Sequence, residues 1–189
     1  MLDVNLGESA MGHSQAEKAQ SRERILAEAS RQVRREGLES VSVGALMKSA
    51  GLTHGGFYGH FENRAALLTE ALQRALQDSA ARSRGARENF GGLVDAYLSP
   101  DHRDSRESGC AMAALASDVA RADDETRAVM SRHVEAFIAN VAKTLGGDED
   151  RAALAVSALV GALTLSRVMI DPARADALLE AVRKELGAL

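Results

Sequence analysis

This chain contains few of the residues that break helices or cross-link a fold. Its 189 residues include two prolines, one cysteine and no tryptophan, and only 3% of them are aromatic. A single cysteine excludes an internal disulfide, which fits the reducing cytoplasm, where we expect the protein. Scarce proline, with abundant alanine, leucine, arginine and glutamate, favours helix. No run of alternating β-branched residues indicates a strand, so we expect an all-α fold.

A membrane segment and a strong charge imbalance are also missing. No basic region followed by an apolar stretch marks a signal peptide, and the most apolar segment, 152–165, is too short to cross a bilayer. The net charge of −4 does not by itself indicate nucleic acid. From Glu17 to Arg64, however, eight basic residues oppose six acidic ones, whereas from residue 65 onward fifteen oppose nineteen. The excess of positive charge therefore lies in the N-terminal part. Because no segment is long enough to span a bilayer, we also expect no membrane partner.

Patterns of catalytic and metal-binding residues are absent from the sequence. The five histidines form no His-x-x-x-His pair, and one cysteine cannot complete a metal cluster. No nucleophile elbow or phosphate loop is present. Cys110 and His133 are a conceivable nucleophile and base, but nothing in the sequence brings them together. We expect neither an enzyme nor a metal or other cofactor.

The most informative stretch is a pair of short predicted helices separated by a glycine. Apolar residues fall at helical spacing in 43–50, and Gly51 supplies the positive φ that a sharp turn needs. Thr53 is placed to cap a second helix of about two turns, which buries Phe57 and Phe61. Two short helices joined by a tight turn, the second polar on its outer face, are typical of a helix-turn-helix.

The rest of the chain divides into an arm and a helical body. Residues 1–16 show no sustained period and are expected to form a flexible arm, followed by a helix-turn-helix head at 17–62. The body at 63–189 begins with a long helix to about residue 84, whose apolar stripe joins it to the head. With a first helix ending near Glu36, about nine helices are expected. The later ones are predicted at 87–98, 109–121, 123–145, 148–170 and 172–186, with a solvated loop at 99–106.

From about Ser21 to Leu68 the sequence resembles the N-terminal domain of the TetR/AcrR family of bacterial transcriptional regulators. The matching blocks are Ile25–Ala29, Gly37–Val43, Ala50–Thr53, Phe57–Phe61 and Asn63–Leu68. Departures are Ser42 where threonine is frequent, Gly44 inside a helix, and Arg64 where lysine is usual. The resemblance implies a ligand-responsive DNA-binding regulator. Its expected form is a repressor released from a near-palindromic double-stranded operator by a small-molecule effector.

The resemblance also assigns roles within the head. Tyr58 and His60 match the family's phosphate-contacting pair, since a hydroxyl and an imidazole can each donate to a phosphate oxygen. Arg64 is a candidate for neutralising backbone charge, and His54 for bonding a base edge. Packing, capping or simple exposure to solvent remain the alternatives for these side chains. The complete predicted DNA-binding set is Ser42, Val43, Thr53, His54, Gly55, Gly56, Tyr58, His60 and Arg64.

A homodimer is expected, because one short reading helix needs a second copy for useful specificity. In the family, the last two helices pair with their symmetry mates as a four-helix bundle. The small apolar side chains of 148–170 and 172–186 fit such close contact, although an ordinary intrachain core fits them too. The residues expected at the interface are Ala155, Leu159, Ala162, Leu163, Ser166, Leu178, Ala181 and Val182.

The effector pocket follows from the resemblance as well, since in the family a small molecule enters the body and shifts the helix that joins it to the head. Methionine and aromatic residues at helical spacing also suit a plain core. The predicted pocket residues are Leu76, Tyr97, Cys110, Met112, His133, Phe137 and Met169.

Nothing in the residues separates an activator from a repressor, and two further alternative functions remain at this level. Cys110 precedes an expected helix, whose N-terminus favours the reactive thiolate, and some TetR-like sensors of electrophiles or oxidants carry a similar Gly-Cys. A regulator that senses such compounds through Cys110 is therefore one alternative, against an inert buried thiol. The other is a helical dimer that binds a ligand or a protein and has lost operator recognition.

Overall fold

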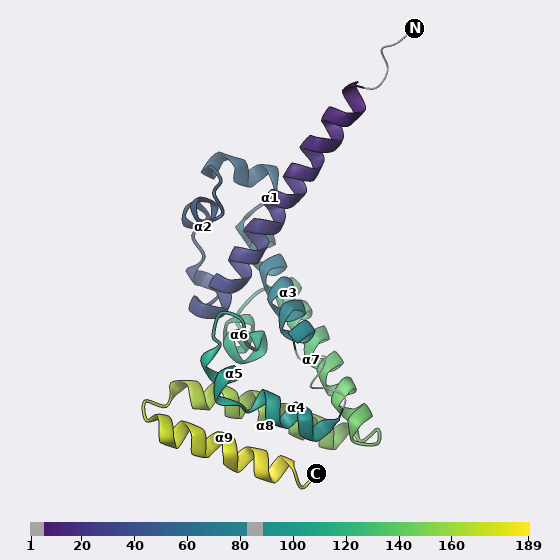
Figure 1. Ribbon diagram of the computed structural model, residues 1–189, viewed down its shortest axis with the longest axis vertical. Helices are drawn as coiled ribbons and strands as arrows, with labels where there is room; N and C mark the ends of the chain where they lie inside the picture. The colour runs from purple at the N-terminus through teal and green to yellow at the C-terminus, as the bar shows by residue number, and fades with distance from the viewer. Residues whose placement is uncertain (1–5, 83–88) are drawn as a thin grey trace.

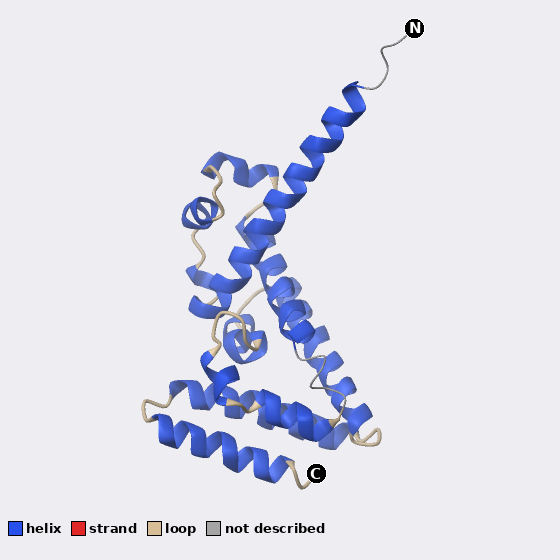
Figure 2. Ribbon diagram, in the orientation of Figure 1, coloured by secondary structure: helices blue, strands red, loops and turns tan. Residues whose placement is uncertain are grey.

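The computed structural model describes residues 6–82 and 89–189, with side chains described from residue 15 onward. Within these ranges every regular element is a helix, as Figure 2 shows, so the all-α prediction is confirmed. The buried apolar side chains form one continuous cluster that runs from the head into the body. A single core therefore places the two parts of the chain in direct contact.

The head is built from the first helices of the chain. They are α1 (Leu6–Glu36), the 3-10 helix η1 (Leu38–Ser40), α2 (Val43–Ser49) and the 3-10 helix η2 (His54–Gly59). Helix α3 (Arg64–Arg82) packs along α1 and continues into the body. The predicted turn between α2 and η2 is present, with φ of 73° at Gly51. Fully or almost fully buried side chains hold these elements together, namely Ile25, Val33, Leu38, Leu46, Met47, Phe57, Phe61, Leu67 and Leu72.

Two local expectations for the head were wrong. Residues 1–16 were expected to form a flexible arm; 1–5 lie outside the described residues, but 6–16 belong to α1, which projects away from the body (Figure 1). Extending an existing helix avoids the cost of nucleation, so these residues join α1. The second helix of the helix-turn-helix is a six-residue 3-10 helix, and Thr53 makes no side-chain cap. Three of its six residues are glycine, which weakens a regular α-helix.

The body consists of helices α4 to α9. Their bounds are α4 (Phe90–Tyr97), α5 (Pro100–Asp104), α6 (Ala111–Val119), α7 (Asp124–Thr144), α8 (Glu149–Val168) and α9 (Pro172–Leu186). Figure 1 shows α8 and α9 side by side at the end of the molecule opposite the N-terminus. Helix α7 packs against both α3 and α8 and so connects that end to the head.

Side-chain caps explain where most body helices begin. Asn89, Asp123, Asp148 and Asp171 each accept a hydrogen bond from a backbone N–H in the first turn of α4, α7, α8 and α9. Ser99 does the same for α5, where Pro100 occupies a position that needs no N–H donor. The segment 99–106 was predicted as a solvated loop, and that prediction was wrong for the five residues of α5.

Helix α8 is the one helix in the described ranges that is long and apolar enough to cross a membrane. Its residues Ala152, Ala155, Val156, Leu159 and Leu163 are at most 4% exposed inside this fold. A core helix of a soluble protein passes the same test of length and composition, so α8 is weak evidence for a membrane span.

Candidate nucleic-acid interface and internal cavity

The second helix of the helix-turn-helix is anchored by two stacked phenylalanines. Phe57 and Phe61 are 2% and 3% exposed, and their ring centroids lie 5.7 Å apart. Tyr58 packs edge-on against Phe57, with centroids 5.2 Å apart, yet remains 72% exposed. The buried pair therefore fixes η2 while its tyrosine is presented to solvent.

Two arginines fasten η2 and the loop before α2 to the rest of the head. Arg22 on α1 ion-pairs with Glu70 on α3, donates to the carbonyl of His60 (3.4 Å) and lies over the Phe61 ring, 4.8 Å from its centroid. Arg64 donates to the backbone carbonyls of Glu39 and Val41 at 2.9 and 3.1 Å. In this structure Arg64 therefore orders the approach to α2, and its expected phosphate contact remains a prediction.

The predicted DNA-binding residues of the head are all exposed or half-buried. Ser42, Thr53, His54 and Gly55 are exposed, as is Tyr58, whereas the other members of the set are half-buried: Val43, Gly56, His60 and Arg64. The start of α2 lies against the start of η2, because a Cβ added at Gly44 would be 3.5 Å from the His54 ring. The starts of α2 and η2 are thus neighbours, and a reading surface made of the whole predicted set stays a prediction.

His60 is less exposed than expected. Its Nδ1 is buried and has no hydrogen-bond partner among the described residues. Burial lowers the pKa of His60, and the positive charges of Lys18 and Arg22 lower it further. Burial and the two nearby cations thus favour the neutral ring, in which one nitrogen can donate to a phosphate.

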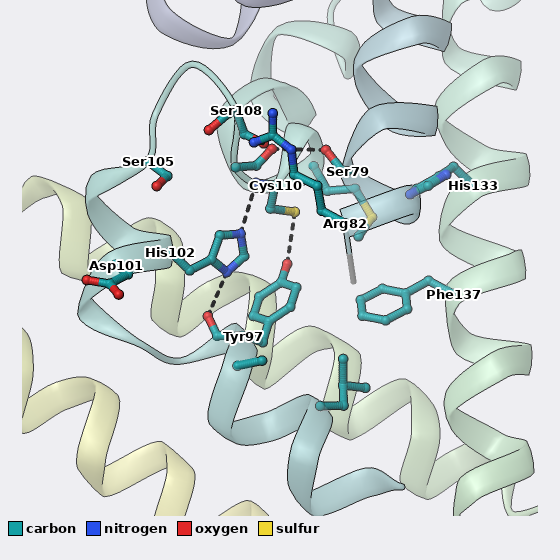
Figure 3. Close-up of a pocket in the computed structure, with 14 residues that line it drawn as sticks. Ser79, Arg82, Tyr97, Asp101, His102, Ser105, Ser108, Cys110, His133 and Phe137 are labelled. Carbon is teal, nitrogen blue, oxygen red and sulfur yellow. Dashed lines mark hydrogen bonds between the residues drawn. The ribbon is translucent and has the colours of Figure 1, made fainter. Parts of the chain in front are cut away.

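The body contains a partly open cavity of about 240 Å³ between helices α3, α4, α5, α6 and α7 (Figure 3). Five of the seven predicted pocket residues line it, namely Tyr97, Cys110, Met112, His133 and Phe137. Leu76 is instead part of the buried core, and Met169 lies at a separate hollow beside Pro172. Both were wrongly placed in the pocket, because helical spacing does not show which neighbour a side chain meets.

A chain of hydrogen bonds joins three cavity residues. The Tyr97 hydroxyl donates to Cys110 Sγ at 2.9 Å, and the Cys110 backbone N–H donates to His102 Nε2 at 3.0 Å. His102 Nδ1 lies 2.8 Å from the Tyr97 carbonyl. Since Nε2 accepts, Nδ1 must carry the proton and donate, which assigns a neutral imidazole in one tautomer. Figure 3 shows the Tyr97 ring standing between His102 and Phe137.

Burial also lowers the pKa of two groups behind this chain of hydrogen bonds. It lowers the pKa of His102, which the Tyr97 carbonyl partly offsets and the nearby Arg167 reinforces. Burial likewise lowers the pKa of Arg167, whose guanidinium donates to the carbonyls of His102 (3.2 Å) and Arg103 (3.0 Å). The C-terminal turn of α8 is thereby tied to the cavity wall.

Sequence reasoning missed several cavity residues. Ser79 and Arg82 come from the end of α3, Leu93 and Ala96 from α4, and a polar rim from α5 and the loop after it: Asp101, His102, Ser105, Ser108 and Gly109. The Ser99-Pro100 pair was a readable capping signal for α5, and with it His102 could have been placed on a helix. No group of three or more His, Cys, Asp or Glu suited to a metal occurs among the residues described.

The predicted dimer residues of α8 face the core of their own chain. Ala155, Leu159, Ala162, Leu163 and Ser166 are at most 3% exposed within the single chain, so they belong to its own core. The apolar side chains on the other face are exposed instead, with Leu154 at 61%, Leu165 at 55% and Val168 at 72%. On α9, Ala181 is exposed, and Leu178 and Val182 are half-buried.

Comparisons with known proteins agree with this architecture. The family model described as bacterial regulatory proteins, tetR family, matches residues 25–71, and that described as tetracyclin repressor-like, C-terminal domain, matches residues 88–189. No curated protein matches the chain.

Three solved structures show the same fold at low identity. E. coli NemR in its reduced form has a TM-score of 0.75 at 18% identity, over 90% of this chain and 96% of that one. A TetR-family regulator from Cytophaga hutchinsonii has a TM-score of 0.79 at 16% identity, over 92% of this chain and 96% of that one. A TetR regulator from Chloroflexus aurantiacus has a TM-score of 0.78 at 18% identity, over 92% of this chain and 95% of that one.

Proposed function

This chain belongs to the TetR family of bacterial regulatory proteins, and from that premise we propose that it is a cytoplasmic transcriptional repressor released from DNA by a small molecule. The observation that carries the proposal is the course of α3. Arg64, its first residue, holds the loop before α2, and Arg82, its last described residue, lines the cavity. One helix thus has an end at each of the two candidate sites.

Helix α3 is suited to transmit a change in the cavity. Its 19 residues form a rod of about 28 Å at a rise of about 1.5 Å per residue. Arg82 donates to the Ser108 carbonyl in the cavity wall at 2.7 Å, so a ligand that displaces that wall also displaces the end of α3. Release follows only if the ligand binds more tightly to the conformation in which the heads no longer match the operator.

On the DNA side, we assign reading and positioning to different residues. Tyr58 is exposed and packs on the buried Phe57, so it is placed to donate to a phosphate and to fix the register of the protein on DNA. His54, at the first position of η2, is placed to reach a base edge. Arg64 acts on the interface indirectly, through the carbonyls of Glu39 and Val41.

A homodimer would place two such heads on a near-palindromic operator. The support for it is the outward face of α8, where Leu154, Leu165 and Val168 are exposed apolar residues on a helix whose other face is core. Together with Ala181 and Val182 of the adjacent α9, this face is the surface that we assign to the second copy. Exposed apolar patches of this kind mark interaction sites.

The experiment that tests the proposal is selection of bound fragments from a random duplex pool at near-physiological salt. The matched control is the Tyr58→Ala, His60→Ala double variant, checked for folding and for dimer content. We expect wild-type protein alone to enrich a motif with two-fold symmetry. If folded wild-type dimer enriches nothing, the protein is instead a helical binding module without operator recognition.

A regulator that senses electrophiles or oxidants is the second candidate, and one contact favours it. Cys110 lines the cavity, precedes α6, and receives hydrogen bonds at Sγ from the Tyr97 hydroxyl (2.9 Å) and the Ala113 N–H (3.5 Å). An oxidant or electrophile that enters the cavity would therefore meet a thiol held in place by two donors. Oxidant should then weaken operator binding by wild type and leave Cys110→Ser unaffected. Equal operator affinities of wild type and Cys110→Ser, each with and without oxidant, would refute this candidate.

A further inference from the structure

The cavity in the body gathers aromatic side chains from a chain that has few of them. Three aromatic residues lie in the body, Phe90, Tyr97 and Phe137, and the last two line the cavity. They are 6% and 2% exposed, and their ring centroids lie 6.0 Å apart with the planes inclined by 24°. Leu93 and Met112 add buried apolar side chains to the same wall. This part of the cavity therefore suits an apolar ligand, and the two rings favour one that itself carries a ring.

A second part of the cavity wall carries positive charge. Arg82, near the end of α3, lines the cavity and is exposed to solvent. Its guanidinium donates to the Ser108 carbonyl at 2.7 Å, and Figure 3 shows it reaching toward Ser108. No carboxylate among the described residues pairs with Arg82. A guanidinium has several N–H donors, so it can hold the Ser108 carbonyl and also bind a carboxylate of a ligand.

Another cation lies directly behind the cavity wall. A Cβ added to Gly109, which lines the cavity, would lie 2.9 Å from Nη2 of Arg167. The hydrogen bonds of this guanidinium go to the neutral carbonyls of His102 and Arg103, so they do not cancel its charge. Helix α6 begins beside the same wall, and the positive end of its dipole adds to the potential. The positive charge at the cavity therefore has more than one source.

Negative charge is scarce around the cavity. Asp101 is the one carboxylate among the described residues that line it, and this side chain is exposed. Figure 3 shows Asp101 on the outer side of His102, away from Arg82 and Phe137. A cationic ligand against the two rings would therefore face positive charge without a carboxylate beside it. The charges of the wall favour an anion.

The volume of the cavity limits the size of that anion. About 240 Å³ is less than the roughly 300–1,000 Å³ typical of pockets for drug-sized ligands. A molecule with one ring and a short acidic group fits this limit. A larger polycyclic compound would require the walls to move apart.

We propose that the ligand of this cavity is a small aromatic carboxylic acid in its ionised form. Its ring packs against Tyr97 and Phe137, and its carboxylate accepts hydrogen bonds from Arg82. Arg167 stabilises the same charge through the wall, without direct contact. This inference rests on the proposed function, because it names the chemical class of the effector.

The test compares acids with neutral amides of nearly the same shape. Benzoate, phenylacetate and cinnamate are paired with benzamide, phenylacetamide and cinnamamide, and isothermal titration calorimetry at pH 7.5 gives each Kd. The quantity compared is the ratio of the Kd of the amide to that of its acid. We expect a ratio of about ten for at least one pair, because hydrogen bonds between charged groups are about twice as strong as neutral ones. Cationic benzylamine should bind more weakly than benzamide.

Two variants of the cavity wall separate charge from packing. Arg82→Gln removes the cation and keeps a donor for the Ser108 carbonyl. It should weaken binding of the acid alone, so that the ratio falls close to one. Phe137→Leu removes a ring and keeps an apolar side chain. It should weaken binding of acid and amide alike, so that the ratio stays near the wild-type value.

Two further variants are controls. Arg82→Lys keeps the charge and should keep a ratio well above one, which distinguishes loss of charge from loss of structure. Arg121→Gln removes one positive charge from an exposed position beyond the C-terminal end of α6, and both Kd values should stay at their wild-type level. Thermal unfolding of every variant shows that the proteins compared are folded.

The outcomes distinguish this inference from the proposed function, because no measurement of ligand Kd involves DNA. Ratios near one for all three pairs in wild type would overturn the inference, as would tighter binding of benzylamine than of benzamide. A wild-type ratio in Arg82→Gln would also overturn it, since the carboxylate would then not be held there. If folded wild type prefers the acids but enriches no operator, the proposed function fails while the ligand class stands.

Discussion

The head and the body arrange their candidate functional residues in opposite ways. In the head they come from one short stretch, 42–64, and most of them are exposed. In the body they come from five helices and face inward around a cavity. A surface for DNA can be built from consecutive residues, whereas a cavity needs side chains that only the packing of distant helices brings together.

The largest expected effect comes from deleting one buried ring in each region. Phe57→Ala should destabilise the head by about 3–5 kcal/mol, as for other buried phenylalanines, and abolish operator binding. Phe137→Ala removes an equally buried ring from the cavity wall and should leave operator binding intact. Denaturant unfolding and fluorescence anisotropy with a labelled operator measure the two quantities. Equal loss of DNA binding in both variants would mean that head and body are not separable in this way.

The next effect concerns the two faces of α8. Leu165→Arg places a charge on the exposed face and should produce monomers, because burying an unpaired charge costs several kcal/mol. Ala136→Arg on the exposed side of α7 is the control and should leave the dimer intact. Light scattering after gel filtration gives the mass of each. A Leu165→Arg protein of dimer mass would place the interface elsewhere.

Removing one hydroxyl from each tyrosine sharpens the comparison further. Tyr58→Phe should weaken operator binding by roughly 1 kcal/mol, the usual net contribution of a hydrogen bond, with similar loss on all sequences. Tyr97→Phe removes the donor to Cys110 and should change only the rate at which that thiol reacts. Binding to the selected operator and to a scrambled duplex measures the first change, and alkylation kinetics measure the second. A change of sequence preference in Tyr58→Phe would contradict its positioning role.

The smallest effect is a pH dependence that arises in the body. Burial holds the pKa of His102 below its ordinary value of 6.5, so the unfolded chain binds this proton more readily than the folded chain. Stability from the neutral ring is therefore present above pH 6.5 and falls below it, by at most about 1.4 kcal/mol per pH unit. His102→Gln should flatten the dependence of unfolding free energy between pH 7 and pH 5.5. An unchanged slope would show that other groups dominate it.

Much of the fold could be predicted from the sequence because its signals are local. Glycine after α1, α2 and α7 and proline at the start of α9 mark helix ends by backbone geometry alone. Two predictions of helix type and helix boundary failed. The glycines of η2 changed its type, and α1 extended through 6–16, where no period was visible.

The candidate DNA-binding set was also local, whereas the cavity and the faces of α8 were not. Cys110 and Phe137 could be suspected from residue type, but His102 became part of the same group only through α5. On α8, small and branched apolar residues surround the helix, so no stripe distinguishes the inner face of Leu159 from the outer face of Leu165.

The sequence by itself determined that the chain is helical, where most helices begin and end, and that a helix-turn-helix lies near its N-terminus. These properties depend on backbone preferences and on residues a few positions apart. Tertiary structure alone decided which side of α8 is core, which side chains share the cavity, and that Asp118 meets Leu38 across 80 residues. Such contacts arise from the packing of whole helices against one another, which no local pattern specifies.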